Sequence, residues 1–168
     1  MTVYVGIDPS TKTGLVRLQQ DLCTESDWVN YPKLTGIERA VTIGESVRSF
    51  IESQKPRIAV IEGYSFGHSS SMSVNMEVGT AIRIAILATG TLLFEVSPQG
   101  LKKFVTGTGG GKKDVVRLGV YKKWGFEHAK DDVVDAYALA QVAKALDTDE
   151  SKLLQYENDV LKKVKRVI

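Results

Sequence analysis

Two short apolar runs, rich in β-branched residues, limit the possible folds of this chain more than any other feature. One covers residues 3–7 and ends at Asp8, and the other covers residues 58–61 and ends at Glu62. Nearly continuous apolar runs of this length are typical of strands that are covered on both faces. Functional side chains in such sheets lie at the carboxyl ends of the strands. If the two strands are neighbours, their carboxylates will therefore emerge together at one edge of the sheet.

The periodicity of the remaining chain predicts helices packed on the faces of this sheet. Apolar residues recur at helical spacing from Thr35 or Gly36 until Pro56. Ser97 and Pro98 form a good helix start, because serine caps the first turn and proline fits its first position. The prediction comprises strands at 3–7, 13–18, 28–31, 57–61 and 92–96, and helices at 36–55, 74–89, 98–105, 113–124 and 131–146. This order indicates an α/β fold with a mixed sheet.

Length and composition favour one globular domain, residues 1–168, with a basic tail or short helix at 147–168. The 168 residues are 43% hydrophobic, which is enough for a real core. The longest apolar stretch, 81–93, is broken and too short to span a bilayer. Cys23 is the only cysteine, so an intrachain disulfide and a zinc cluster of cysteines are excluded. Without a signal-peptide pattern, these features predict a cytoplasmic protein that has no membrane partner.

A third acidic stretch suggests what the carboxylates at the sheet edge are for. Asp132 and Asp135 are three residues apart, so a helix would place them on one face near its first turn. Gathering bare carboxylates is unfavourable, because like charges repel and desolvation is costly. Divalent cations remove this penalty, and hard oxygen ligands suit magnesium or manganese. Two such ions activate a water and stabilise the leaving oxygen of a phosphodiester. The predicted catalytic and metal-binding residues are Asp8, Glu62, Asp132 and Asp135.

Each of these acids has a simpler interpretation when it is taken alone. Asp8 precedes Pro9 and is a common turn residue. Asp131 and Asp132 are both suited to cap a helix, and the spacing to Asp135 favours Asp132 as the ligand. We therefore interpret Asp131 as a cap or a supporting residue. The joint pattern is far more specific than any of its members.

A basic segment accompanies the acidic pattern although the formal net charge of the chain is only +2. Seven basic residues stand against one acid between residues 99 and 123. This segment suits a phosphate backbone, and the glycines at 109–111 let the main chain approach it closely. The simpler alternative is a solvated helix face and a surface loop with incidental lysines. The predicted DNA-binding residues of this segment are Lys102, Lys103, Lys112, Lys113 and Arg117.

Five motifs follow one another along the chain: Gly6–Gly14, Ile61-Glu62, Pro98–Lys102, Gly107–Gly109 followed by Lys112-Lys113, and Asp132–Ala140. Taken in this order, they resemble the RuvC family of Holliday-junction resolvases, within the ribonuclease H-like superfamily. The resemblance covers residues 3 to about 145. The aspartate–glutamate–aspartate pattern is specific to the superfamily, and the Pro-Gln and Gly-Thr-Gly segments indicate the family.

The resemblance implies a ribonuclease H-like fold and a magnesium-dependent endonuclease that nicks two opposed strands of a four-way junction. It implies a homodimer, two Mg²⁺ ions per site that Mn²⁺ can replace, and no further small-molecule cofactor. The apolar helix at 74–89 is our candidate dimer interface, and an ordinary core helix is the alternative. The family places an aromatic wedge shortly after the glutamate, where this chain has Tyr64 and Phe66 as candidate DNA contacts. The serine-rich loop that follows departs from that pattern and leaves junction selectivity open.

Three other functions stay open on the sequence alone. A debranching nuclease for forks, flaps and Y-structures would keep the chemistry and widen the substrate. An actin-like nucleotide-binding fold also begins with Gly-Ile-Asp, but it needs two lobes, and this chain has room for one. A non-catalytic junction-binding module is disfavoured, because it would gain nothing from carboxylates beside phosphates. The small size would suit a phage or bacterial protein.

Overall fold

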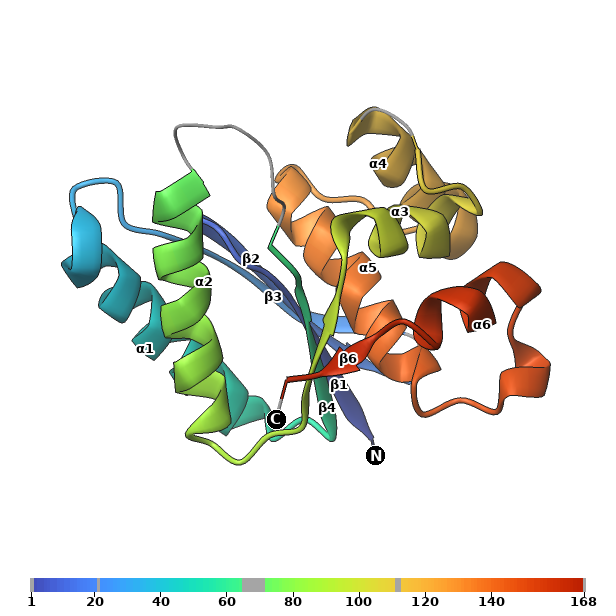
Figure 1. Ribbon diagram of the computed structural model, residues 1–168, viewed down its shortest axis with the longest axis horizontal. Coiled ribbons are helices and arrows are strands. Elements are labelled where there is room, and N and C mark those ends of the chain that lie inside the picture. The colour runs from blue at the N-terminus through green and yellow to red at the C-terminus, as the bar shows by residue number, and fades with distance from the viewer. Residues whose placement is uncertain (1, 21, 65–71, 111–112, 168) are drawn as a thin grey trace.

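The computed structural model describes residues 2–20, 22–64, 72–110 and 113–167 as one mixed sheet between two layers of helices (Figure 1). The six strands lie in the order β3-β2-β1-β4-β5-β6. β1 and β4 are parallel neighbours at the centre, β4 and β5 are parallel, and the other pairs are antiparallel. The strands are β1 (Val3–Asp8), β2 (Lys12–Gln19), β3 (Leu22–Asn30), β4 (Ile58–Glu62), β5 (Leu93–Val96) and β6 (Lys165–Arg166).

The helices divide between the two faces of the sheet. α1 (Gly36–Gln54) and α2 (Met72–Leu87) cover one face, and the remaining helices lie on the other (Figure 1). α5 runs directly along the centre of the second face, and α3, α4 and α6 pack around it. The helices of this second layer are α3 (Pro98–Thr106), α4 (Lys113–Trp124), α5 (Asp131–Ala145), the 3₁₀ helix η1 (Glu150–Lys152) and α6 (Gln155–Leu161).

Alternation along the central strands determines which side chains meet which layer. Val5 and Ile7 of β1 are fully buried against α1 and α2, together with Ile61 of β4. Val60 of β4 points to the opposite face and joins the core formed with α5. Because successive side chains alternate, residues 8 and 62 point to the α5 face.

Glycine allows α5 to lie unusually close to the sheet. A Cβ atom on Gly6 would lie 1.9 Å from the carbonyl oxygen of Ala136, and one on Gly14 would lie 2.0 Å from that of Asp132. No side chain fits at either place without displacing the helix backbone. The two glycines therefore fix the height of α5 over β1 and β2, and Gly14 does so at its first turn.

The predicted α/β class and most predicted elements are confirmed, with two differences at the sheet edges. β3 begins at Leu22, six residues before the predicted strand, and four consecutive residues within it are exposed. β6 was not predicted. Lys165 and Arg166 pair with Glu95 and Phe94, so part of the basic tail becomes the sixth strand. No helix in the described ranges is long and apolar enough to cross a membrane.

Candidate active site

The parallel pairing of β1 and β4 brings the first two predicted acids together. Ile7 is in register with Ile61, so Asp8 and Glu62 are neighbours at the carboxyl ends of the two strands. Both side chains are partly buried. The condition set in the sequence analysis, that the two strands are neighbours, is therefore met, and their carboxylates emerge at one edge of the sheet.

α5 supplies the other two predicted acids from its first turns. Asp132 and Asp135 are both partly buried, on a helix whose residues Val133, Val134 and Ala136 are buried. With Asp8 and Glu62 they line one cavity of about 330 Å³, whose far wall is formed by Tyr64 and the start of α2. The helix dipole favours negative charge at this end of α5. The structure thus places all four predicted acids around one space.

The donor set suits a hard divalent cation, although it is not a finished coordination shell. In the parts of the chain that the structure describes, no three histidine, cysteine or acidic side chains stand close enough together to hold a metal ion. The four acids offer eight carboxylate oxygens around the cavity, and oxygen is the donor that Mg²⁺ and Mn²⁺ prefer. Asp8, Glu62 and Asp135 each make other interactions in this state. The residues present therefore fit the metal in type and line one cavity, and they would have to draw closer together to form its ligand set.

The structure separates Asp131 from Asp132. The N-cap of α5 is Lys130, with no side-chain capping bond, so our interpretation of Asp131 as the cap is wrong. Asp131 is exposed and forms an ion pair with Arg117 at 2.8 Å. Asp132 instead lines the cavity with the other three acids. Its carboxylate accepts a hydrogen bond from the indole N–H of Trp28 at 3.1 Å. The geometry agrees with Asp132 rather than Asp131 as the acid directed to the site.

Sequence reasoning missed Arg83 of α2, which bonds to residues of both β4 and β5 next to the site. Its side chain is only 10% exposed and donates to Glu95 at 2.6 Å. It also donates to the backbone oxygens of Glu62 at 3.0 Å and Gly79 at 2.9 Å. The guanidinium stacks on the ring of Tyr64, with 4.2 Å from its central carbon to the ring centroid. The only sequence signal was a single arginine inside an apolar helix.

Tyr64 is held on α2 in this state. Besides its stacking on Arg83, its hydroxyl lies 2.8 Å from that of Thr80. A Cβ atom on Gly79 would come within 3.0 Å of the Tyr64 ring, so this glycine makes room for the stack. Phe66, the other candidate wedge, lies outside the described residues.

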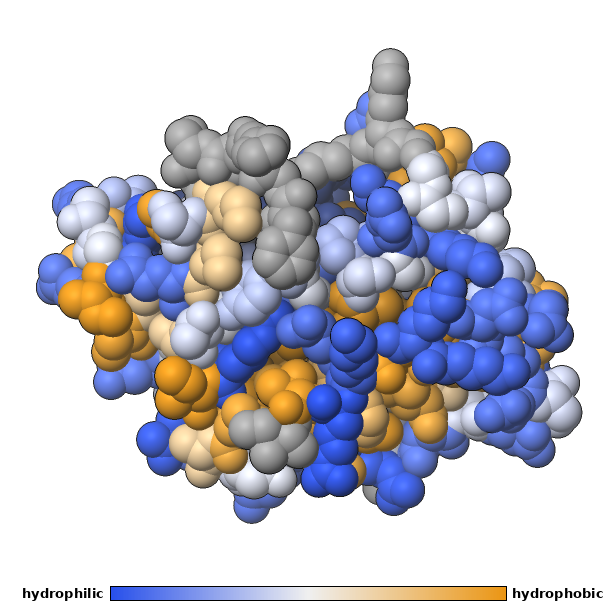
Figure 2. Space-filling model, viewed as in Figure 1, coloured by the Kyte–Doolittle hydropathy of each residue, from blue (hydrophilic) through white to orange (hydrophobic). Residues whose placement is uncertain are grey.

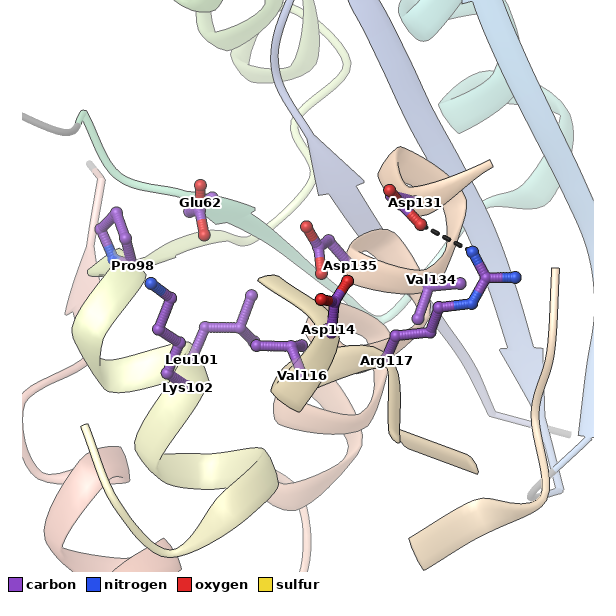
Figure 3. A pocket seen from close by; sticks show the side chains of 10 residues that line it. All are labelled: Glu62, Pro98, Leu101, Lys102, Asp114, Val116, Arg117, Asp131, Val134 and Asp135. Atoms are coloured by element: carbon purple, nitrogen blue, oxygen red, sulfur yellow. Dashed lines mark hydrogen bonds and ion pairs between the residues drawn. The ribbon is translucent and has the colours of Figure 1, made fainter. Parts of the chain in front are cut away.

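A second cavity, of about 250 Å³, adjoins the first through Glu62 and Asp135 (Figure 3). Lys102 reaches from α3 toward Glu62, and Arg117 reaches from α4 toward α5. Arg117 also donates to the backbone oxygen of His128 at 2.9 Å. Two cationic groups therefore flank the acids on the side away from α2.

Among the described residues of the basic segment, Lys123 and Lys103 do not share a surface with Lys102 and Arg117. Lys123 points inward, where it donates to Glu157 at 2.5 Å and lies over the rings of Phe104 and Trp124. Lys103 pairs with Asp159 of α6 at 3.4 Å. Lys112 and the side chain of Lys113 lie outside the described residues. Lys102 and Arg117 are thus the predicted DNA contacts that the structure places beside the acids.

Comparison with known proteins agrees with this architecture. Residues 4–143 match the family model described as crossover junction endodeoxyribonuclease RuvC. The RuvC of Moorella thermoacetica is 32% identical over 149 residues, which cover 82% of this chain and 88% of the relative. The RuvC of Chloroflexus aggregans is 29% identical over 147 residues, covering 81% of this chain and 88% of the relative.

Two solved structures share the fold. One is described as the Thermus thermophilus RuvC structure, with a TM-score of 0.72 and 19% identity over 99% of this chain and 100% of that one. The other is described as T. thermophilus RuvC in complex with Holliday junction substrate. It has a TM-score of 0.67 and 21% identity, covering 83% of this chain and 91% of that one. The matched residues include all four acids, and the chain belongs to the RuvC family of crossover junction endodeoxyribonucleases, which are metal-dependent nucleases.

Proposed function

We propose that this protein resolves four-way DNA junctions by paired nicks, with two Mg²⁺ ions held by Asp8, Glu62, Asp132 and Asp135. The observation that carries the proposal is the single cavity that these four acids line at the carboxyl ends of β1 and β4. Family membership supports the reaction, and a relative of the same fold is described in complex with a Holliday junction substrate. Mn²⁺ has the same ligand preference and is expected to replace Mg²⁺.

The residues around the cavity divide the work of hydrolysis. When bound, the metal ions supply a water of lowered pKa and stabilise the leaving oxygen. The four acids would hold the metal ions. Their carboxylates are placed by the ends of β1 and β4 and by the first turns of α5. Lys102 and Arg117 line the adjoining cavity and suit the negatively charged DNA backbone. Tyr64 forms the opposite wall, where an aromatic ring suits an exposed base.

A cleavage assay tests this function. Purified protein with Mg²⁺ is expected to nick a labelled four-way junction at opposed positions on two strands. Asp8→Asn removes a charge from the cavity and is expected to lower the rate by at least about 100-fold, while junction binding in Ca²⁺ persists. Glu52→Gln is the control, because Glu52 is exposed on α1, across the sheet from α5. Cutting that survives Asp8→Asn would contradict the assignment.

The outer surface of α1 and α2 supports a homodimer. Ile84 is 64% exposed and Ile37 is 67% exposed, and they line a shallow groove together with Val41 and Met76. Figure 2 shows hydrophobic side chains gathered on this side of the molecule, whereas the side of α3 and α6 is mostly hydrophilic. Exposed apolar patches of this kind mark protein interfaces. We propose that a second copy of the chain covers this groove, which would present two active sites to one junction.

Ile84→Glu tests the dimer, because a buried carboxylate at the centre of the groove would be unpaired. We expect a monomer by light scattering and the loss of paired nicking, with any remaining cuts confined to one strand. Leu22→Glu is the matched control, since Leu22 is 66% exposed on β3, away from the groove. A variant that remains dimeric and still makes paired cuts would place the interface elsewhere.

A broader debranching nuclease is the second candidate function. Tyr64 is held on α2 by two contacts, and a ring in that position is not free to act as a wedge. Comparing cleavage rates on a four-way junction, a fork and a linear duplex separates the two functions. A rate on forks equal to that on junctions would favour debranching.

Two further expectations rest on the same proposal. We treat residues 1–168 as a single nuclease domain, and β6 supports this because the C-terminal segment completes the same sheet. The proposed substrate would place the protein in the cytoplasm of a bacterial cell or of a phage-infected host.

A further inference from the structure

Trp28 makes a hydrogen bond that ends directly on one of the four acids, Asp132. Its indole Nε1 donates to Oδ2 of Asp132 at 3.1 Å. Trp28 belongs to the edge strand β3 and is partly buried, whereas the four residues before it are exposed. An indole N–H can only donate a hydrogen bond, so its partner here is the accepting carboxylate oxygen of Asp132.

The strand register explains how an edge residue reaches the active site. Trp28 lies directly across from Gly14 of β2, so its side chain points to the α5 face, where a Cβ atom on Gly14 would also point. Gly14 has no side chain, and the backbone of Asp132 occupies the space above it. The indole therefore extends over the glycine to the first turn of α5. Any side chain at position 14 would remove this path.

The ring of Trp28 is held from its other side by Lys130. The ammonium group of Lys130 lies 4.4 Å from the ring centroid, within the range of a cation–π contact. Lys130 is the N-cap of α5, two residues before Asp132. The ring is thus anchored on β3 and contacts the start of α5 at both Lys130 and Asp132. These two contacts direct its N–H toward Asp132.

We propose that Trp28 is a positioning residue that orients Asp132 for metal binding. The indole holds Oδ2, which restricts rotation of the carboxylate of a residue that lines the cavity. Groups that hydrogen-bond a ligating carboxylate raise metal affinity by fixing its orientation, and their removal typically costs 10–100-fold. This inference rests on the proposed role of Asp132 as a ligand.

The chain also contains a means of observing this contact. It has two tryptophans, and Trp124 packs with Phe104 and Tyr137 in the core of the second layer. In Trp124→Phe, Trp28 is the only source of tryptophan emission. Mg²⁺ or Ca²⁺ that binds Asp132 would change the environment of the indole N–H and hence its emission.

The experiment combines fluorescence, calorimetry and activity. We expect the emission of Trp124→Phe to change with Mg²⁺ in a saturable way, with the midpoint that calorimetry gives for the wild type. Adding Asp8→Asn should shift that midpoint strongly or abolish the response. Trp28→Phe keeps the ring but loses the donor, and its metal midpoint by calorimetry should rise by about 10-fold or more. Its cleavage rate should recover at high Mg²⁺, because the acids are intact.

The outcomes separate the two proposals. If the wild type binds metal and Trp28→Phe binds it with an unchanged midpoint, the role of Trp28 is refuted and the proposed function stands. If the wild type binds neither Mg²⁺ nor Mn²⁺, the proposed function fails and the role of Trp28 fails with it. Thermal unfolding without metal detects any loss of folding in Trp28→Phe, and Trp28→His, which retains a ring N–H donor, should recover part of the affinity if the donor matters. A loss that Trp28→His does not recover at all would indicate packing alone and overturn the proposal.

Discussion

Replacing Gly6 with alanine is expected to lower the free energy of unfolding by about 3 kcal/mol or more, the upper end of overpacking effects. The added Cβ atom would lie 1.9 Å from the backbone oxygen of Ala136 and 2.3 Å from the backbone nitrogen of Ala140. Both atoms belong to the helix backbone, so neither is free to rotate away. The strain is relieved only if α5 lifts from the sheet, which would also open the core beneath it.

Urea unfolding followed by circular dichroism measures this effect. Gly110→Ala is the matched control, because a Cβ atom there meets nothing within 4 Å. The control is expected to be neutral or slightly stabilising, since alanine reduces the freedom of the unfolded chain. A Gly6→Ala variant as stable as this control would show that α5 does not lie as close to β1 as described.

Replacing Arg83 with methionine is expected to destabilise the fold by about 3 kcal/mol, because it leaves a partly buried carboxylate without its partner. Arg83 is 10% exposed and Glu95 is 32% exposed, so Glu95 recovers only part of its hydration. The substitution also removes the Arg83 hydrogen bond to the backbone oxygen of Glu62 and the support of the Tyr64 ring. We therefore expect a weaker metal response and slower cleavage in addition to lower stability.

A double-mutant cycle separates the ion pair from the other contacts of Arg83. Arg83→Met combined with Glu95→Gln removes the unpaired charge and should recover part of the lost stability. Cleavage should remain slow in the double variant, because the bond to the Glu62 backbone is still missing. Full recovery of both stability and cleavage would show that Arg83 serves only to neutralise Glu95. Additive losses in stability would contradict the coupling of Arg83 and Glu95.

The parts of the fold that sequence predicted well are those with a strong local signal. The runs that end at Asp8 and Glu62 are apolar and β-branched, so their strands and their carboxyl ends were predictable. The capping serine at position 97 marks the start of α3, where its side chain accepts from the backbone of Gly100 at 3.1 Å. The three-residue spacing of Asp132 and Asp135 predicted that both lie on one face of α5, and this prediction needed no information on packing.

Features that depend on partners distant in sequence were not predictable. β6 is two residues long and basic, and it becomes a strand only because β5 offers a free edge. Lys123 has the same local signal as a solvated lysine, and its burial follows from Glu157 and the surrounding rings. The role of Trp28 follows from its contact with Asp132, 104 positions away, and that of Arg83 from its contact with Glu95, 12 positions away. Local patterns carry no information on such pairs.

The central claim is that the acids at the carboxyl ends of β1 and β4 and at the start of α5 form the metal site. The most direct measurement is anomalous diffraction from a crystal soaked in Mn²⁺. We predict manganese peaks within the cavity lined by Asp8, Glu62, Asp132 and Asp135, within bonding distance of their carboxylate oxygens. Manganese bound only elsewhere, such as at Asp114 and Asp131 of the adjoining cavity, would contradict the account.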